Sequence, residues 1–236
     1  MSGTWLILPT YNEAENLERL VRTALPRLAE AAPEHRVLVV DDGSPDGTGQ
    51  IADRLADEFE QVEVMHRTAK AGLGRAYLAG FQRALAGGAD LLIEMDSDFS
   101  HNPADLPRLT RAAGDTDLVI GSRYVDGGGV ENWPFYRRAL SRGGSLYARV
   151  VLGVPVRDLT GGFKCFHRRT LEGIDYLHTH ADGYGFQIEL TYRAYKAGFS
   201  VREIPIVFRE REYGVSKMTA RIALEAIWKV PALRFR

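Results

Sequence analysis

Short runs of apolar and β-branched residues alternate with amphipathic helical patterns through the first half of the chain. The strand-like runs are 4–8, 36–41, 62–66, 91–95 and 117–121, and the helical patterns between them cover 13–28, a segment ending at 59, and 73–86. Parallel strands joined by helices of this length need right-handed crossovers, which place helices on both faces of the sheet. We therefore predict an α/β fold with a mostly parallel sheet and helices on both faces.

The alternation loosens after about residue 127. A helix is expected over 135–152, a strand over 163–167, a helix over 186–197 and a strand over 201–208. A chain of 236 residues can bury a substantial core, and its sequence contains no repeat, low-complexity linker or clear domain boundary. We predict a single domain with a modified C-terminal part.

Composition narrows the function classes. The 30 Lys and Arg residues balance 31 Asp and Glu residues, and a net charge of −1 argues against nucleic-acid binding through bulk charge. The single cysteine, Cys165, excludes an internal disulfide and a cysteine-rich zinc site, and it suits a reducing compartment. The first residues predict no secretory leader, and no apolar run reaches the roughly 18 residues of a spanning helix. We expect a cytoplasmic protein that can lie on a membrane without crossing it.

Polar residues follow four of the predicted strands, in the segments 9–13, 41–44, 94–98 and 121–124. Open parallel sheets bind ligands at the carboxyl ends of their strands. The sequence therefore predicts one ligand site built from these four segments.

The most informative of these segments is Asp96-Ser97-Asp98, which follows a buried strand. In extended backbone, residues two apart point the same way, so both carboxylates can face one divalent cation. Mg²⁺ and Mn²⁺ are commonly held by one or two carboxylates together with substrate phosphate oxygens. The alternative is an acidic turn in which Asp98 or Asn102 caps the next helix; the position after a buried strand favours the metal site.

Asp41 and Asp42 end the second predicted strand and begin a segment rich in turn-forming residues. A carboxylate at this place can accept a hydrogen bond from a ribose hydroxyl or a base N–H. The same residues could simply form a turn, and the two interpretations are compatible, because a turn would present the carboxylates.

Two groups of basic residues could meet phosphate. Arg209, Arg211 and Lys217 lie around a glycine after the last predicted strand, where a loop could close over a diphosphate, although Glu210 and Glu212 also suit a solvated charged loop. The segment 133–169 has eight basic residues against one acid, with apolar residues between them. Such a segment can lie in an anionic membrane interface, or it can be a helix packed on the sheet with an arginine-rich outer face.

Other familiar motifs are missing. Gly72-Leu73-Gly74 lacks the third glycine of a dinucleotide fingerprint, and the sequence contains no phosphate loop of the nucleoside-triphosphatase type. No His-Glu-x-x-His or Gly-x-Ser-x-Gly pattern occurs.

Seven segments in order resemble the glycosyltransferases of family 2 that have the GT-A fold, and more narrowly the polyprenol-phosphate mannose synthases. They are 9–13, 40–48, 70–74, 95–98, 121–124, 127–133 and 211–217, which together span nearly the whole chain. The resemblance implies one GT-A domain over 1–236, with a nucleotide-binding half at 1–125 and an acceptor and lid half at 126–236. One departure is Ser100, which stands where the family often has a longer glutamine near the metal.

The resemblance also implies roles. Mannose would pass from GDP-mannose to a polyprenyl monophosphate with inversion, with Mg²⁺ or Mn²⁺ as cofactor, at a membrane surface and with a separate anchoring protein as a further candidate partner. Asp96, Asp98 and Ser100 would lie at the metal, and Arg123, Arg211 and Lys217 would act with Asp98 on the phosphates. The remaining donor-site residues would be Pro9, Tyr11, Glu13, Val40, Asp42 and Ser97, and the candidates for the lipid phosphate are Arg137, Arg138 and Arg142.

Two other functions stay open from the residues alone. One is transfer of glucose from UDP-glucose to a polyprenyl phosphate, because no residue fixes the base or the sugar from first principles. The other is a non-catalytic nucleotide-binding adaptor, against which the intact acidic and basic residues argue.

Overall fold

The computed structural model describes residues 3–179, 183–210 and 230–234. Its strands are β1 (Gly3–Thr10), β2 (His35–Asp41), β3 (Val62–His66), β4 (Ala89–Glu94), β5 (Leu118–Ser122), β6 (Gly129–Val130), β7 (Lys164–His167), β8 (Val201–Pro205) and β9 (Val207–Phe208). Its α-helices are α1 (Leu17–Ala29), α2 (Thr48–Glu58), α3 (Leu73–Ala86), α4 (Leu106–Ala112), α5 (Phe135–Leu152), α6 (Arg168–Gly173) and α7 (Tyr184–Lys196). Short 3₁₀ turns lie at η1 (Pro103–Asp105), η2 (Ala113–Asp115) and η3 (Tyr176–His178), and residues 230–234 are helical.

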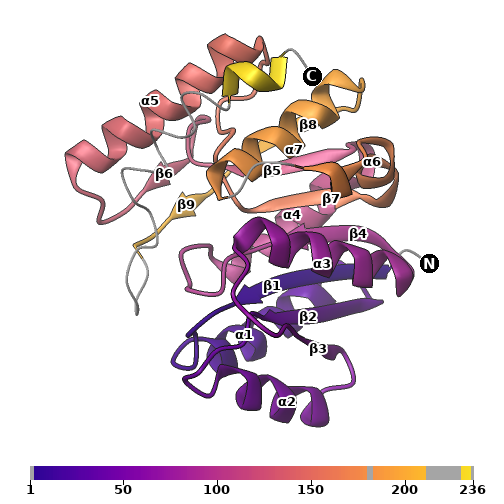
Figure 1. Cartoon of the computed structure of the whole chain (residues 1–236). Helices are drawn as coiled ribbons and strands as arrows, with labels where there is room; N and C mark the ends of the chain where they lie inside the picture. Colours follow the sequence, from indigo (N-terminus) through magenta and orange to yellow (C-terminus); the bar gives the residue numbers. More distant parts are fainter. Residues whose placement is uncertain (1–2, 180–182, 211–229, 235–236) are drawn as a thin grey trace.

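The main sheet has seven strands in the order β3-β2-β1-β4-β7-β5-β8 (Figure 1). β7 runs antiparallel to both of its neighbours, and the other paired strands are parallel. The prediction of a mostly parallel sheet is confirmed. Strand direction is not readable from the apolar run at 163–167, so the antiparallel insertion between β4 and β5 was not foreseen.

Alternating side chains of β1 divide the core into two layers. Trp5 and Ile7 pack into the cluster that contains α3, α6 and α7, whereas Leu6 and Leu8 pack into the cluster that contains α1, α2 and α4. Side chains that alternate along a strand point to opposite faces of the sheet. Helices therefore cover both faces, as predicted.

Two predicted elements need correction. The strand expected over 201–208 is two strands, because Ile206 donates from its N–H to Ser122 O at 3.0 Å while its own carbonyl accepts from Gly129 N at 3.0 Å. The chain thus leaves the main sheet at this residue and enters the two-stranded sheet β6-β9. The helix expected from residue 13 begins at Leu17, since Glu13–Asn16 form a turn whose side chains bond within it.

Helix α5 lies beside β6 and away from α2 and β3 (Figure 1). Its inner face buries Ser145, Ala148 and Leu152. Large apolar side chains stay exposed on the rest of the helix: Phe135, Tyr136, Leu140, Leu146 and Val150. The described residues contain no helix that is both long and apolar enough to cross a bilayer.

Candidate active site

The carboxyl ends of β1, β2 and β4 lie at one edge of the sheet, because the three strands are parallel neighbours. Ser97, just after β4, donates from its hydroxyl to Pro9 O at 3.0 Å and so ties the ends of β4 and β1 together. Ser97 was predicted to touch the nucleotide; in the structure its side chain holds two strand ends in register.

The two aspartates after β2 have separate tasks. Asp41 holds the turn, since its carboxylate accepts from the Ser44 hydroxyl at 2.6 Å and from the Ser44 N–H at 3.1 Å. Asp42 instead accepts from Arg67 Nη1 at 2.6 Å and from Ala71 N at 3.3 Å. The turn interpretation is confirmed by the Asp41 bonds, whereas binding of a ribose hydroxyl or a base N–H by Asp42 stays a prediction. Arg67, a partner from the end of β3, was not foreseen.

The remaining residues that were predicted to bind the nucleoside differ in their contacts and burial. The Lys70 ammonium lies 4.1 Å from the centre of the Tyr11 ring, which is a cation–π contact. Glu13 is buried, with its N–H donating to the Thr48 hydroxyl at 2.9 Å. The Val40 side chain is fully buried in the core and supports the strand end, and its contact with a nucleoside stays a prediction.

The acidic segment after β4 folds as a tight turn. The Asp98 carboxylate accepts from Ser100 N at 3.1 Å, and Phe99 between them has a φ of 59°. This left-handed conformation is uncommon for a bulky residue and marks strain at functional sites. Asn102 caps the following 3₁₀ turn by accepting from Ala104 N at 3.0 Å. The turn interpretation was correct in its geometry, and it leaves the acidic side chains at the strand end.

The donor set at this turn fits a hard divalent cation. The buried Ser100 hydroxyl has no hydrogen-bond partner among the described residues. A Cβ at Gly162 would lie 3.7 and 3.8 Å from the two carboxylate oxygens of Asp96, so the glycine keeps the space at that carboxylate open. Within the described residues, no three or more His, Cys, Asp or Glu side chains form a metal-binding group. Two carboxylates with further oxygens from a substrate match the way proteins bind Mg²⁺ and Mn²⁺.

His101 braces the same turn from inside. Its Nδ1 accepts from Asp96 N at 3.3 Å, and its ring stacks on Phe163 at 5.1 Å between ring centroids. Burial lowers the pKa of His101 to about 4, so the ring is neutral and carries its proton on Nε2. No pattern in the sequence predicts this role, since it depends on a contact across the fold.

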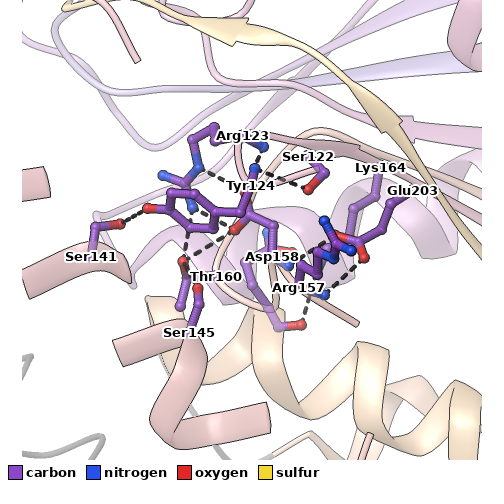
Figure 2. A network of polar contacts seen from close by, with 11 residues as sticks. Ser122, Arg123, Tyr124, Ser141, Ser145, Arg157, Asp158, Thr160, Lys164 and Glu203 are labelled. Carbon is purple, nitrogen blue, oxygen red and sulfur yellow. Dashed lines mark hydrogen bonds and ion pairs between the residues drawn. The ribbon is translucent and has the colours of Figure 1, made fainter. Parts of the chain in front are cut away.

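Arg123 follows β5 and is almost fully buried against Asp158 (Figure 2). Its Nε and Nη2 donate to the two carboxylate oxygens at 2.7 and 2.6 Å, and its backbone N–H adds a bond of 2.9 Å. Burial raises the pKa of Asp158, but the Arg123 charge and these bonds outweigh that effect and lower it below 3.8. Asp158 is the single acid among the eight basic residues of the segment 133–169. This isolation is the only feature of the sequence that points to its role.

A chain of hydroxyl groups joins this ion pair to α5 (Figure 2). Arg123 Nη2 also donates to the Thr160 hydroxyl at 2.8 Å, which lies 3.2 Å from the Ser145 hydroxyl of α5. The Tyr124 hydroxyl donates to Ser141 Oγ at 2.6 Å. The inner face of α5 is thereby connected to the end of β5.

The glycosyl transferase family 2 profile matches residues 5–174. The chain belongs to glycosyltransferase family 2. It is similar to a polyprenol monophosphomannose synthase of Mycolicibacterium smegmatis, with 52% identity over 229 residues covering 96% of this chain and 85% of that protein. It is also similar to an undecaprenyl-phosphate mannosyltransferase of Micrococcus luteus, with 50% identity over 95% of this chain and 90% of that protein.

Among solved structures, this glycosyltransferase resembles glucosyl-3-phosphoglycerate synthase from Mycobacterium tuberculosis in complex with phosphoglyceric acid. The TM-score is 0.74 at 19% identity, covering 99% of this chain and 80% of that one. A crystal structure of the same synthase with Mn²⁺, UDP and glucosyl-3-phosphoglycerate has a TM-score of 0.73 at 18% identity, with 99% and 80% coverage. These likenesses confirm the GT-A fold.

The structure separates the basic residues that the sequence grouped together. In this glycosyltransferase Arg137 forms an ion pair with Glu210, and its guanidinium lies 4.2 Å from the Trp133 ring centre. Arg138 is exposed, and Arg142 lies exposed near the Tyr124 ring. Within the part of the chain that the structure describes, Arg137 is the only one of the three acceptor candidates that is paired with a carboxylate.

Arg211 and Lys217, the predicted lid cations, lie outside the described residues. The residues just before them are held by two hydrogen bonds of Arg209. Arg209 donates from its backbone to Ser100 O at 3.1 Å and from Nε to Glu131 at 2.9 Å. The start of the predicted lid is therefore joined to the acidic turn of the glycosyltransferase.

Proposed function

We propose that this chain transfers mannose from GDP-mannose to a polyprenyl monophosphate, with inversion at the anomeric carbon, to give polyprenyl-phosphate mannose. The observation that carries the proposal is the acidic turn of Asp96 and Asp98 at the end of β4, in a chain half identical over nearly its whole length to two polyprenyl-phosphate mannose transferases.

The donor would lie across the strand ends. Tyr11, Glu13 and Asp42 surround the site after β1 and β2, where the nucleoside would bind, and Pro9 and Val40 form the strand ends beneath it. Asp96 and Asp98, with Ser100 near them, would hold Mg²⁺ or Mn²⁺, which would neutralise charge on the nucleoside diphosphate as it departs. Arg211 and Lys217 would add positive charge from the lid.

The acceptor supplies its own nucleophile. A phosphate monoester with a second pKa near 6 is largely dianionic at neutral pH. One of its oxygens attacks the anomeric carbon, and the electron pair of the breaking C–O bond leaves with the diphosphate. A strong protein base is unnecessary, so Asp98 would hold the metal and orient the acceptor. A pH–rate profile with a large, Asp98-dependent base limb would contradict this role.

Basic residues near α5 would bind the acceptor phosphate. Arg123 is fixed by Asp158, so its place is set before any ligand arrives, and Arg137 lies at the start of α5, where it pairs with Glu210. Arg138 and Arg142 are exposed on the same helix. Pre-positioned guanidinium groups suit a phosphate that must meet the anomeric carbon in one orientation.

The outer face of α5 would lie in the membrane interface. Phe135, Tyr136 and Val150 are 85%, 73% and 69% exposed, and exposed arginines stand between them on the helix. Apolar and basic residues on one helix favour binding at an anionic bilayer surface. A lipid-linked acceptor makes such an attachment useful, because the acceptor phosphate is confined to that surface.

The test is an assay of the full chain with a polyprenyl phosphate in detergent, supplied with GDP-mannose or with UDP-glucose. Mass spectrometry of the lipid should reveal a hexose adduct with GDP-mannose and Mg²⁺ or Mn²⁺, and none after chelation. Asp96→Asn should lose the product, whereas Asp90→Asn, at a half-exposed carboxylate outside the site, should keep it. A glucosyl adduct alone would favour the glucosyltransferase, and no nucleotide release with any donor would favour a binding protein.

A further inference from the structure

A layer of buried polar side chains lies beneath the acidic turn. Tyr77 of α3, Glu94 of β4, Lys164 of β7 and Gln187 of α7 are all buried. Glu94 and Lys164 are direct partners in the antiparallel β4–β7 register. Burying polar groups is costly unless they are bonded, so four of them gathered at one place ask for an explanation beyond packing.

Tyr77 connects this layer to the candidate metal site. Its hydroxyl donates to Asp96 Oδ1 at 3.4 Å. Hydrogen bonds at catalytic sites are often long before the ligands are bound. This hydrogen bond is made to a carboxylate that would also bind the divalent cation.

Packing alone does not need the hydroxyl. The Tyr77 ring lies 6.2 Å from Phe81 and 6.2 Å from Phe186, nearly parallel to the latter. A phenylalanine would fill the same space without a polar atom to satisfy. The presence of the hydroxyl is therefore explained by its hydrogen bond to Asp96.

Gln187 and Asp96 face the same glycine, Gly162. Lys164 Nζ donates to Gln187 Oε1 at 2.7 Å, which turns the amide nitrogen away from the lysine. A Cβ at Gly162 would lie 3.6 Å from that nitrogen and 3.7 Å from Asp96 Oδ1, so both groups face the same glycine. No hydrogen-bond partner of Gln187 Nε2 is found within the described residues. Gly162 thus leaves space beside the Asp96 carboxylate, which Tyr77 contacts through its hydroxyl.

We propose that Tyr77 is a positioning residue that fixes the orientation of the Asp96 carboxylate for the divalent cation of the sugar donor. The inference rests on the proposed function, which assigns the cation to Asp96. A carboxylate already held in one orientation loses less freedom when it binds a metal, and groups that orient metal ligands typically contribute 10–100-fold to metal affinity.

The experiment compares Mn²⁺ binding to the full wild-type chain and to Tyr77→Phe, measured by the electron paramagnetic resonance signal of free Mn²⁺ with saturating GDP and again with UDP. We expect Tyr77→Phe to weaken Mn²⁺ binding about tenfold. Binding of the nucleotide in the presence of a chelator should stay unchanged.

Tyr176→Phe is the matched control. Tyr176 is also buried, and its ring packs on Phe81 at 6.0 Å, the same ring that contacts Tyr77. It should leave Mn²⁺ binding unchanged. Thermal unfolding of both variants, with titrations made well below the lower Tm, keeps loss of fold separate from loss of metal.

The outcomes separate the two proposals. If wild-type binds Mn²⁺ in a way that Asp96→Asn abolishes, and Tyr77→Phe binds it equally well, the positioning role is wrong and the metal assignment stands. If wild-type does not bind Mn²⁺ with either nucleotide, both the metal assignment and the positioning role are overturned.

Discussion

Among substitutions that remove a single charge, we expect those in the buried pair of Arg123 and Asp158 to lower the free energy of unfolding most. The Arg123 side chain is 4% exposed and that of Asp158 0%. Asp158→Asn keeps the shape of the side chain but removes its negative charge and turns an amide NH₂ toward the buried guanidinium of Arg123.

The expected loss follows from the geometry. Breaking a buried, hydrogen-bonded ion pair by removing one partner costs about 3–5 kcal/mol. For a chain of this size, each kcal/mol lowers Tm by roughly 2–4 °C, which gives a fall of roughly 6–20 °C. The measurement is urea and thermal unfolding of the full chain followed by circular dichroism.

Asp126→Asn is the control, since Asp126 is fully exposed and lies 3.4 Å from Arg157. An exposed pair of this kind contributes between about 0 and 1 kcal/mol. The double variant Arg123→Met with Asp158→Leu removes both buried charges together, so it should be more stable than Asp158→Asn. An Asp158→Asn variant as stable as Asp126→Asn would refute the reasoning.

The same pair fixes a pH dependence. Because folding lowers the pKa of Asp158 below its ordinary 3.8, the ionised form is favoured in the folded state. Its contribution to stability is complete above pH 3.8 and is lost as the pH falls through the lower, folded value. Asp158→Asn should therefore remove part of the acid sensitivity of unfolding.

Three further outcomes are expected. Gly80→Ala should destabilise the fold by about 1–3 kcal/mol in urea unfolding, because its Cβ would lie 2.6 Å from Ile7, whereas Gly144→Ala, with open space around it, should stabilise α5 by up to about 1 kcal/mol. Burial lowers the pKa of Lys164 from 10.5 to about 8, so the unfolded chain binds more protons between these values. The free energy of unfolding should rise with pH across that window, and Lys164→Met should flatten the rise. Burial raises the pKa of Cys165 to about 12, so a thiol reagent should label this residue only at the rate at which the chain unfolds; rapid labelling of the native protein would contradict its burial.

Periodicity was enough to locate most elements of the fold. The helices at 73–86 and 135–152 and the strand at 62–66 have the predicted bounds, because their apolar patterns end at clear turn residues. Helices α4 and α6 were missed, since each has only six or seven residues and too few turns to reveal a period. The order of the strands in the sheet depends on long-range pairing, which periodicity does not encode.

The candidate site was predictable where it depends on the position of a residue after a strand. Asp42 and Asp98 both follow strands and both lie where the sequence placed them. Partners from distant segments were not predictable, and Arg67 and Asp158 are examples, 25 and 35 residues from the groups they bind. A charged residue does not reveal its partner in the sequence, because the partner is chosen by the packing of the strands between them.

The two faces of α5 suggest why one helix would serve both a lipid surface and a reaction centre. Ser141 and Ser145 on the inner side connect through hydroxyl groups to Tyr124, Thr160 and then Arg123. The apolar side chains on the outer side are exposed. A helix fixed at its inner face cannot tilt in a membrane without moving the residues at the end of β5. A bilayer that binds the outer face would therefore fix the distance between the acceptor phosphate and Arg123. Attack on the anomeric carbon needs the phosphate in one position, so this distance has to stay constant.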